Sequence, residues 1–429
     1  MDELFPKVSR DERQAESVNL WLKHKGRGTV VSATGTGKTV IAIKCIAKVR
    51  TKYPTLSVLV VVPTSQLKDQ WEVELKKWGV AKNTEVRVMM GASKFKENKW
   101  ERLECDMLVI DEAHRINAEG ISDIFNNVKF DLILGLTATF ERLDGRHEIL
   151  SKYAPVVDTI TMQEALWNGW ISKYTDYVVL IDVDDIDKYR EYNKEFNEHF
   201  EFFDRDFNLI MSLLGPKGIF NKIKLRDQMC HGDESKKKDI LKAITVHANG
   251  FTRMLQLRKK FVWEHPEKLR IAEEIIKARP NSKIITFSAN TKVAESFSSG
   301  FVYTGKQGKK KNRMSLEEFS KLPSGQLHTV KLAEEGMNLP DLSVGIMLGV
   351  NSSKTKAVQT LGRVVRLSKN KNAEFFTLVI NDTIETEWLK KSRIDDSFVI
   401  IDEENLMKVL KGEPYETYKR KLKNFTYRF

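Results

Sequence analysis

Residues 32–39, Ser-Ala-Thr-Gly-Thr-Gly-Lys-Thr, combine two glycines with a lysine and hydroxyl side chains. Glycines let backbone N–H groups close around phosphate oxygens, and a helix beginning here would present its positive end to them. Lys38 would reach the β- and γ-phosphates, and Thr39 would offer a hydroxyl to magnesium. The alternative, a glycine-rich turn without a ligand, is disfavoured because the loop follows an apolar run and precedes a helical pattern. We predict an ATP and Mg²⁺ site formed by Thr34, Gly35, Thr36, Gly37, Lys38 and Thr39.

Two adjacent carboxylates, Asp111 and Glu112, come directly after the apolar run Leu108–Ile110. A carboxylate at the end of a strand beside the phosphate-loop strand can hold magnesium, usually through water. The second carboxylate can orient and deprotonate an attacking water. Acidic residues also favour an ordinary helix N-terminus, but that alternative does not explain a pair that follows an apolar strand. We predict Asp111 as a metal ligand and Glu112 as the general base.

A third group of chemically active residues lies near residue 365, where Gln359 precedes Arg363 and Arg366. Arginines three positions apart share one face of a helix. Two guanidinium groups on one face can neutralise the charge that develops on a transferred γ-phosphate. A pair of surface arginines in salt bridges is the alternative for an isolated motif, and the order of the motifs favours the catalytic role.

Alternating apolar strands and helical patterns must position these groups. Such alternation predicts doubly wound α/β lobes, in which ligands bind at the carboxyl ends of parallel strands. One series of strands lies in residues 1–170 and a second in residues 171–429. The expected strands are Thr29–Ala33, Val58–Val62, Met107–Ile110 and Leu132–Leu136, then Lys283–Phe287, His328–Leu332, Val344–Leu348 and Phe375–Ile380.

Residues 184–263 have a different composition, rich in Lys, Glu, Phe and Tyr, with few strand signals. They predict a helical insertion in or before the second lobe. Packing in a core is favoured over base stacking for the aromatic residues of this segment. The tail, residues 410–429, is basic and aromatic; a solvated terminus is favoured there over contact with nucleic acid.

The chain has 429 residues and a formal net charge of +12. This length predicts two or three domains. A basic surface favours polyanions, although charge alone does not decide for nucleic acid. Three widely spaced cysteines indicate a reducing compartment rather than a disulfide or zinc framework. With no run near the roughly 20 apolar residues of a membrane span and no signal peptide, we expect no membrane partner and a cytoplasmic location, the host cytoplasm if the source is viral.

The tetrad Asp111-Glu112-Ala113-His114 resembles motif II of the DEAH-box proteins of helicase superfamily 2. Motifs similar to the others of that superfamily follow in order between about Arg10 and Arg366. The resemblance implies two RecA-like lobes that hydrolyse ATP and move along nucleic acid. In it, Gln359, Arg363 and Arg366 correspond to motif VI.

The same resemblance implies roles for further residues. Gln14 stands at the position of an adenine-binding glutamine, although Asp11-Glu12-Arg13 replaces the usual lead-in. The residues expected to contact nucleic acid are Pro63, Thr64, Ser288 and Thr329. Those expected to couple the two sites are His114, Thr137 and Thr139, and Gly336 and Asn338 join the nucleotide site.

Residues 140–145 are similar to the XPB and phage UvsW branch of the superfamily. The resemblance implies a DNA helicase or translocase that unwinds or remodels branched or forked DNA, moves 3′ to 5′, and serves replication, recombination or repair; a monomer is favoured, although the sequence does not determine the oligomeric state. A duplex translocase without strand separation and an RNA-dependent ATPase are the alternatives within the superfamily. A non-catalytic nucleic-acid-binding subunit is the alternative of another class, and the intact Lys38, Glu112, Arg363 and Arg366 argue against it.

Overall fold

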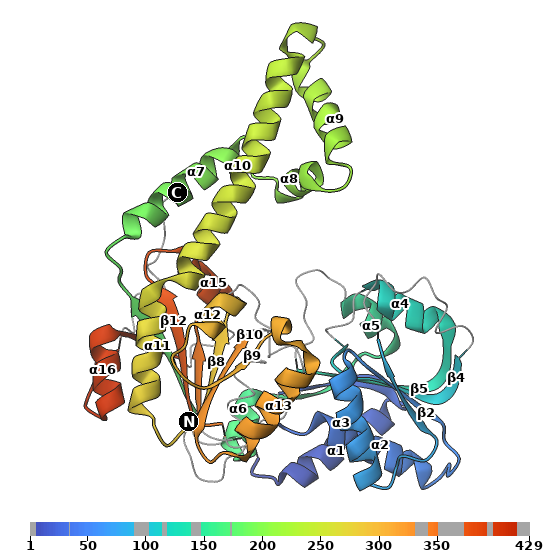
Figure 1. Cartoon of the computed structure of the whole chain (residues 1–429). Coiled ribbons are helices and arrows are strands. Elements are labelled where there is room, and N and C mark those ends of the chain that lie inside the picture. The colour runs from blue at the N-terminus through green and yellow to red at the C-terminus, as the bar shows by residue number, and fades with distance from the viewer. Residues whose placement is uncertain are drawn as a thin grey trace.

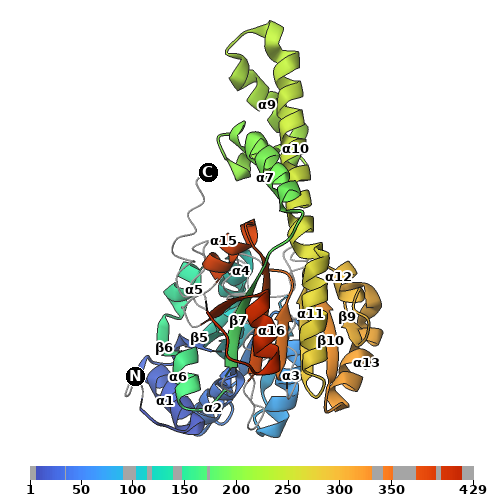
Figure 2. The ribbon, with the colours of Figure 1, turned by 90° about the vertical axis from the view of Figure 1, so that its left-hand side faces the viewer.

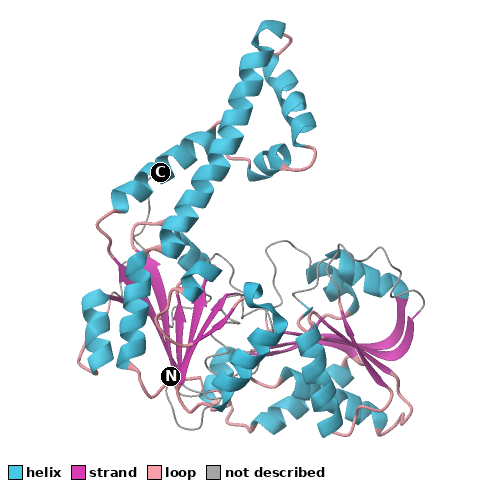
Figure 3. Cartoon of the chain, in the orientation of Figure 1, coloured by secondary structure: helices cyan, strands magenta, loops and turns pink. Residues whose placement is uncertain are grey.

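The structure, a computed structural model, describes residues 6–33, 35–89, 103–113, 118–138, 147–171, 174–330, 342–350, 373–392 and 398–417. These residues form two parallel β-sheets with helices on both faces of each sheet, and a helical projection (Figures 1 and 3). The predicted fold of two parallel-sheet α/β lobes with a helical insertion is therefore confirmed. Eight predicted site residues lie outside the described residues, namely Thr34, His114, Thr139, Gly336, Asn338, Gln359, Arg363 and Arg366.

The first sheet has the strand order β3-β2-β4-β5-β1-β6 in the described residues, with every recorded pair parallel. Its central strands are almost entirely apolar because helices cover both of their faces. The strands are β1 (Arg27–Ser32), β2 (Val58–Val62), β3 (Thr84–Val88), β4 (Leu103–Ile110), β5 (Val128–Thr137) and β6 (Val156–Ile160). The helices are α1 (Arg10–Lys23), α2 (Lys38–Arg50), α3 (Ser65–Lys77), α4 (Ala118–Asn127), α5 (His147–Tyr153) and α6 (Met162–Trp167).

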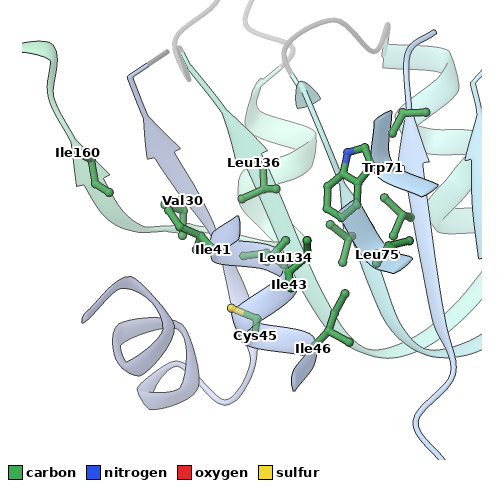
Figure 4. Close-up of a cluster of buried hydrophobic side chains, with 14 of the residues drawn as sticks. Val30, Ile41, Ile43, Cys45, Ile46, Trp71, Leu75, Leu134, Leu136 and Ile160 are labelled. Atoms are coloured by element: carbon green, nitrogen blue, oxygen red, sulfur yellow. The ribbon is translucent and has the colours of Figure 1, made fainter. Parts of the chain in front are cut away.

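Helix α2 is anchored on this sheet by an apolar face. Ile41 and Ile46 are fully buried against Val30 of β1 and Leu134 of β5 (Figure 4). Burying one such side chain contributes roughly 1.5–3 kcal/mol. This packing holds the first turn of α2, and thus Lys38, at the carboxyl edge of the sheet.

The strand order corrects one expectation. The strand that ends at the acidic pair was predicted to neighbour the strand of the phosphate loop, but β5 lies between β4 and β1. The order of the strands in the sequence does not determine their order in the sheet, because a crossover helix can place a later strand between two earlier ones. The consequence is that Thr137, at the end of β5, lies between the two motifs.

The second sheet has the order β13-β7-β12-β11-β8-β10-β9 in the described residues, again parallel. Its strand β7 precedes the helical insertion and was not predicted. The strands are β7 (Tyr174–Ile181), β8 (Lys283–Ser288), β9 (Phe301–Tyr303), β10 (Gly325–Val330), β11 (Val344–Met347), β12 (Ala373–Ile380) and β13 (Val399–Asp402). The helices are α11 (Pro266–Ala278), α12 (Thr291–Glu295), α13 (Gly308–Lys321), α15 (Ile384–Ser392) and α16 (Glu403–Lys411).

The helical insertion projects away from both sheets (Figures 1 and 2). Its own core includes the buried Phe203 and Phe251, and the Phe196 ring lies 4.8 Å from that of Phe251. This confirms core packing for most of its aromatic residues; Phe220, 68% exposed, is an exception. The elements are α7 (Ile186–Glu201), α8 (Phe207–Leu214), α9 (Gly218–Cys230), the 3-10 helix η3 (Glu234–Lys236) and α10 (Lys237–Glu264). Across the described ranges, no helix has both the length and the apolarity needed to cross a bilayer.

A buried ion pair ties α11 to the carboxyl edge of the second sheet. Lys268 Nζ donates to both oxygens of Glu385, at 2.7 and 2.6 Å, and to Leu348 O at 2.9 Å. The two side chains are 1% and 0% exposed. Burial lowers the pKa of Lys268 and raises the pKa of Glu385, so each depends on the other to remain charged.

We expect Lys268→Met to lower the free energy of unfolding by about 3–5 kcal/mol, because Glu385 would remain buried without its partner. Urea denaturation would measure the change, and Lys268→Met/Glu385→Leu should recover much of it. As a control, Arg313→Met removes the exposed ion pair with Glu317 and should leave the urea midpoint unchanged. Equal midpoints for Lys268→Met and the wild type would contradict the prediction.

His328 of β10 is a buried imidazole held in its neutral form. Its Nε2 donates to Ser299 O at 2.7 Å, its Nδ1 lies 3.0 Å from Thr286 Oγ1, and its ring stacks on Phe297. Because a carbonyl oxygen can only accept, the proton must be on Nε2. Burial lowers the pKa of His328 from 6.5 to about 4.

Acid should therefore destabilise the fold through His328. Below about pH 6.5 this histidine is protonated in the unfolded chain but stays neutral in the folded chain. The free energy of unfolding therefore falls as the pH drops to about 4, by roughly 3 kcal/mol in total. Urea midpoints measured between pH 7 and pH 4 would show the slope, and His328→Gln, which does not titrate, should show a shallower one. Parallel slopes for both proteins would exclude this histidine as the cause.

Candidate nucleotide site

The loop after β1 has a backbone that glycine permits. Gly35 and Gly37 have φ of 91° and 94°, the left-handed region that disfavours other residues. A Cβ on Gly37 would also lie 2.5 Å from Gln14 Nε2. Gly37 is the N-cap of α2 and supplies no side chain to bond the first N–H groups of the helix. These N–H groups are the donors that an anion at a helix N-terminus uses.

Short-range hydrogen bonds shape the same loop. Thr36 Oγ1 donates to Ala33 O at 2.7 Å and is hydrogen-bonded to Ser32 Oγ, which stands where the general motif has glycine. Gln14 is 4% exposed, and its Nε2 donates to Thr36 O at 3.0 Å. The structure thus places Gln14 against the phosphate loop, while adenine binding by Gln14 stays a prediction.

The acidic pair lies at the carboxyl end of β4. Asp111 is 3% exposed; its Oδ2 accepts from Trp71 Nε1 at 2.8 Å and its Oδ1 from Glu112 N at 2.8 Å. Burial, with the nearby charge of Glu112, raises the pKa of Asp111 to about 6. Glu112 has φ of 48°, an unusual value for a residue with a side chain and one found often at functional sites.

Lys38 converges on this pair. Lys38 Nζ lies 3.6 Å from Glu112 Oε1, although the two residues are 74 positions apart. An ammonium, two carboxylates and a glycine loop at a helix N-terminus therefore share one edge of the sheet. This arrangement has the groups needed to bind a triphosphate and to activate water beside it.

The donor set also fits magnesium. Mg²⁺ prefers oxygen ligands, and Asp111 offers a buried carboxylate whose pKa is raised chiefly by burial, so a bound cation would stabilise its charged form. Thr39, half-buried in the first turn of α2, carries the second oxygen predicted for the metal. Magnesium ligation by Asp111 and Thr39 stays a prediction that the chemistry of these oxygens favours.

Thr137 ends β5 between the loop and the acidic pair. It is 1% exposed and pairs in register with Val31 of β1, and Gly135 pairs with Ile110 of β4. A Cβ on Gly135 would lie 2.5 Å from Thr29 Oγ1, so the close approach of β1 and β5 requires glycine. Its position between both motifs suits the coupling role predicted for Thr137.

The four residues predicted to contact nucleic acid have different surroundings. Pro63 and Thr64 are half-buried at the end of β2, and Thr64 Oγ1 caps α3 by accepting from Leu67 N at 3.3 Å. Ser288 is 7% exposed, and its Oγ has no hydrogen-bond partner within the described ranges. For Thr329 the structure corrects the expectation. Thr329 is fully buried and its hydroxyl donates to Thr286 O at 2.8 Å, so in this conformation its side chain bonds within the sheet.

Sequence reasoning missed two features of the site. Trp71 was assigned no role from the sequence, yet its Nε1 donates to the predicted metal ligand Asp111. Arg13 was treated as a departure from the usual lead-in, yet it is 8% exposed and bonds Asp158 and Glu164. The signal available for Arg13 was its place in the charged triplet Asp11-Glu12-Arg13, directly before Gln14.

Family models match two parts of the chain. Residues 7–104 and 86–142 match the type III restriction enzyme res subunit, and residues 267–368 match the helicase conserved C-terminal domain. The DNA 3′-5′ translocase XPB2 of Sulfurisphaera tokodaii is 27% identical over 403 residues, which span 90% of this chain and 85% of that protein.

Solved structures share the fold. The Hef helicase domain of Pyrococcus furiosus aligns with a TM-score of 0.52 and 16% identity, covering 91% of this chain and 98% of that one. Dbp5 of S. cerevisiae, bound to RNA and ADP BeF3, aligns with a TM-score of 0.55 and 13% identity, covering 93% and 91%. At these identities the likeness concerns the two-lobed fold alone.

Proposed function

Because the chain belongs to the superfamily 2 helicases, which are nucleic-acid-dependent ATPases, we propose that it is an ATP-driven DNA helicase or translocase. The observation that carries the proposal is the convergence of Lys38 with Asp111 and Glu112 at one sheet edge. The likeness to a DNA 3′-5′ translocase along 90% of the chain favours DNA over RNA and favours 3′-to-5′ movement.

The proposed chemistry assigns each group one task. Lys38 and the first N–H groups of α2 hold the β- and γ-phosphates. Magnesium, held by Asp111 and Thr39, would neutralise phosphate charge. Glu112 takes the proton of the attacking water, and the ammonium of Lys38 lies 3.6 Å from this carboxylate.

The second lobe completes the proposed site. We assign Arg363 and Arg366, with Gln359, to the wall that meets the γ-phosphate when the lobes close, and Gly336 and Asn338 to the nucleotide. His114 and Thr139 would join Thr137 in coupling, as in DEAH-box motors. We place the domain boundary near residue 170; the first sheet ends at Ile160 and the second begins at Tyr174, which supports it.

We further propose that the substrate is branched or forked DNA in replication, recombination or repair, as in UvsW-like phage enzymes. Pro63, Thr64 and Ser288 would contact DNA phosphates, so little sequence preference is expected. ATPase assays with single-stranded, duplex, forked and four-way DNA, and with matched RNA, test this. We expect four-way or forked DNA to stimulate most; greater stimulation by RNA would contradict the proposal.

Duplex translocation without strand separation is the second candidate, favoured by the description of the Sulfurisphaera relative as a translocase. The two candidates differ in what they do to paired strands. Displacement of a triplex-forming strand without unwinding of a fork would support translocation, whereas release of a fork strand would support the helicase.

A further inference from the structure

Helix α1 touches two parts of the molecule that are distant in sequence. On one side Gln14 donates to Thr36 O in the phosphate loop, 22 residues away. On the other side the preceding residue, Arg13, reaches Asp158 and Glu164, about 150 residues away. These two acids belong to a segment that we call the connector, residues 158–171, which runs from β6 through α6 toward β7.

Every N–H donor of the Arg13 guanidinium has an acceptor. Nη1 and Nη2 form a two-point contact with Asp158, at 2.8 and 2.7 Å, and Nε donates to Glu164 at 2.6 Å. The remaining two donors meet Ser17 Oγ at 3.2 Å and Thr159 O at 3.3 Å. Arg13, Asp158 and Glu164 are each 7–9% exposed, so the geometry is fixed by packing as well as by charge.

The chain just before α1 binds the same connector. Val8 N donates to Asn168 Oδ1 at 2.9 Å, and Trp170 Nε1 donates to Val8 O at 3.2 Å. Arg10 and Lys7 donate to the carbonyl oxygens of Trp170 and Trp167. A displacement of α1 therefore either carries the connector with it or breaks these hydrogen bonds.

The other end of the connector is buried in a hydrophobic cluster that includes residues of both lobes. Trp170 and Ile171 are 5% and 3% exposed and belong to one hydrophobic cluster with Ile285 and Phe287 of β8. Buried apolar contacts of this kind transmit displacement because protein interiors are close-packed. Hydrogen bonds thus join the phosphate loop to α1 and α1 to the connector, and the connector shares a buried cluster with the second sheet.

We propose that Arg13 is a positioning residue that couples occupancy of the nucleotide site to the connector between the lobes. When phosphates draw the loop closed, Gln14 follows Thr36, and α1 carries Arg13 and the connector with it. This inference rests on the proposed function only in that ATP is taken as the ligand of the loop. Arg13 is buried and its guanidinium donors bind protein acceptors, so we assign it no contact with nucleotide or nucleic acid.

Amide hydrogen exchange of the full chain, with and without Mg²⁺ and a non-hydrolysable ATP analogue, tests the linkage without turnover. In the wild type the analogue should slow exchange in the phosphate loop and in residues 158–171. In Arg13→Lys, which keeps the charge but loses the two-point contact, the loop should still respond, while the response of the connector falls about tenfold, within the usual range of coupling. Asp158→Asn should reproduce this loss.

Arg279→Lys is the matched control, because Arg279 makes a similar two-point contact with Glu374 in the second lobe. Arg279→Lys should retain the connector response even if its melting temperature falls as much as that of Arg13→Lys. A wild-type connector that ignores the analogue, or an Arg13→Lys connector that responds fully, would overturn the proposal.

Kinetics give a second readout that a purely structural role would not produce. In Arg13→Lys, KM for ATP should change less than about threefold, whereas DNA stimulation of kcat should fall about tenfold. A fall in melting temperature with an unchanged stimulation ratio would make Arg13 only structural. Absence of DNA stimulation in the wild type would contradict the proposed function. The hydrogen-exchange experiment would still test the coupling between the nucleotide site and the connector.

Discussion

Lys38→Ala should abolish DNA-stimulated ATP hydrolysis, with kcat/KM for ATP falling by at least about 10²–10³-fold. The ammonium is the cation that the described site places beside the acidic pair, 3.6 Å from Glu112. Without it, the β- and γ-phosphates would lose the positive charge that this helix supplies beside the two carboxylates. A coupled phosphate-release assay measures the loss.

The control for Lys38→Ala is Lys44→Ala, on the same helix α2. Lys44 pairs with Asp11 on α1, away from the acidic pair, and its removal should leave turnover within about twofold because partly exposed ion pairs contribute little. Thermal unfolding of both variants would show that α2 remains packed. Undiminished turnover in Lys38→Ala would refute the assignment of the loop as the ATP site.

Glu112→Gln should bind ATP yet hydrolyse it about 10²–10⁴-fold more slowly, the usual contribution of a positioned general base. The amide keeps the size of the side chain but cannot accept the proton of water. The substitution also removes a charge that raises the pKa of Asp111, so that pKa should fall. Single-turnover hydrolysis and binding of a fluorescent ATP analogue measure the two quantities separately.

Glu104→Gln, on strand β4 that leads to the acidic pair, is the matched control for Glu112→Gln. Glu104 is an exposed carboxylate paired with Lys129, and it should be dispensable for hydrolysis. If Glu112→Gln weakened ATP binding and hydrolysis by the same factor, Glu112 would be a binding residue and another group would have to act as the base.

Local sequence predicted the phosphate loop and the acidic pair because phosphate and metal chemistry require particular residue types at short, fixed spacings. Gly35, Gly37 and Lys38 lie within four residues, and Asp111 and Glu112 directly follow a buried strand. The structure agrees: both glycines have left-handed φ values and Lys38 reaches Glu112. The alternation of apolar runs and helical patterns similarly predicted two parallel sheets and the helical insertion.

Long-range pairing could not be predicted in this way. Local periodicity shows that a segment is a strand but not which strands lie beside it, so the insertion of β5 between β4 and β1 was missed. Strand β7, separated from β8 by the whole insertion, pairs with β12 almost 200 residues later. The residues of β7 were therefore recognised as a strand only from their pairing with β12 in the structure.

The roles of single polar residues depended on the same long-range contacts. Thr329 matched a motif that contacts nucleic acid, but its hydroxyl donates a hydrogen bond to Thr286 O of the neighbouring strand β8. In the sequence Arg13 is one of several charged residues on a helix, and only the structure shows that it binds Asp158 and Glu164. Composition and spacing thus determined which chemistry the chain can carry, and tertiary structure decided which side chains perform it, because burial and partners arise only when distant segments pack together.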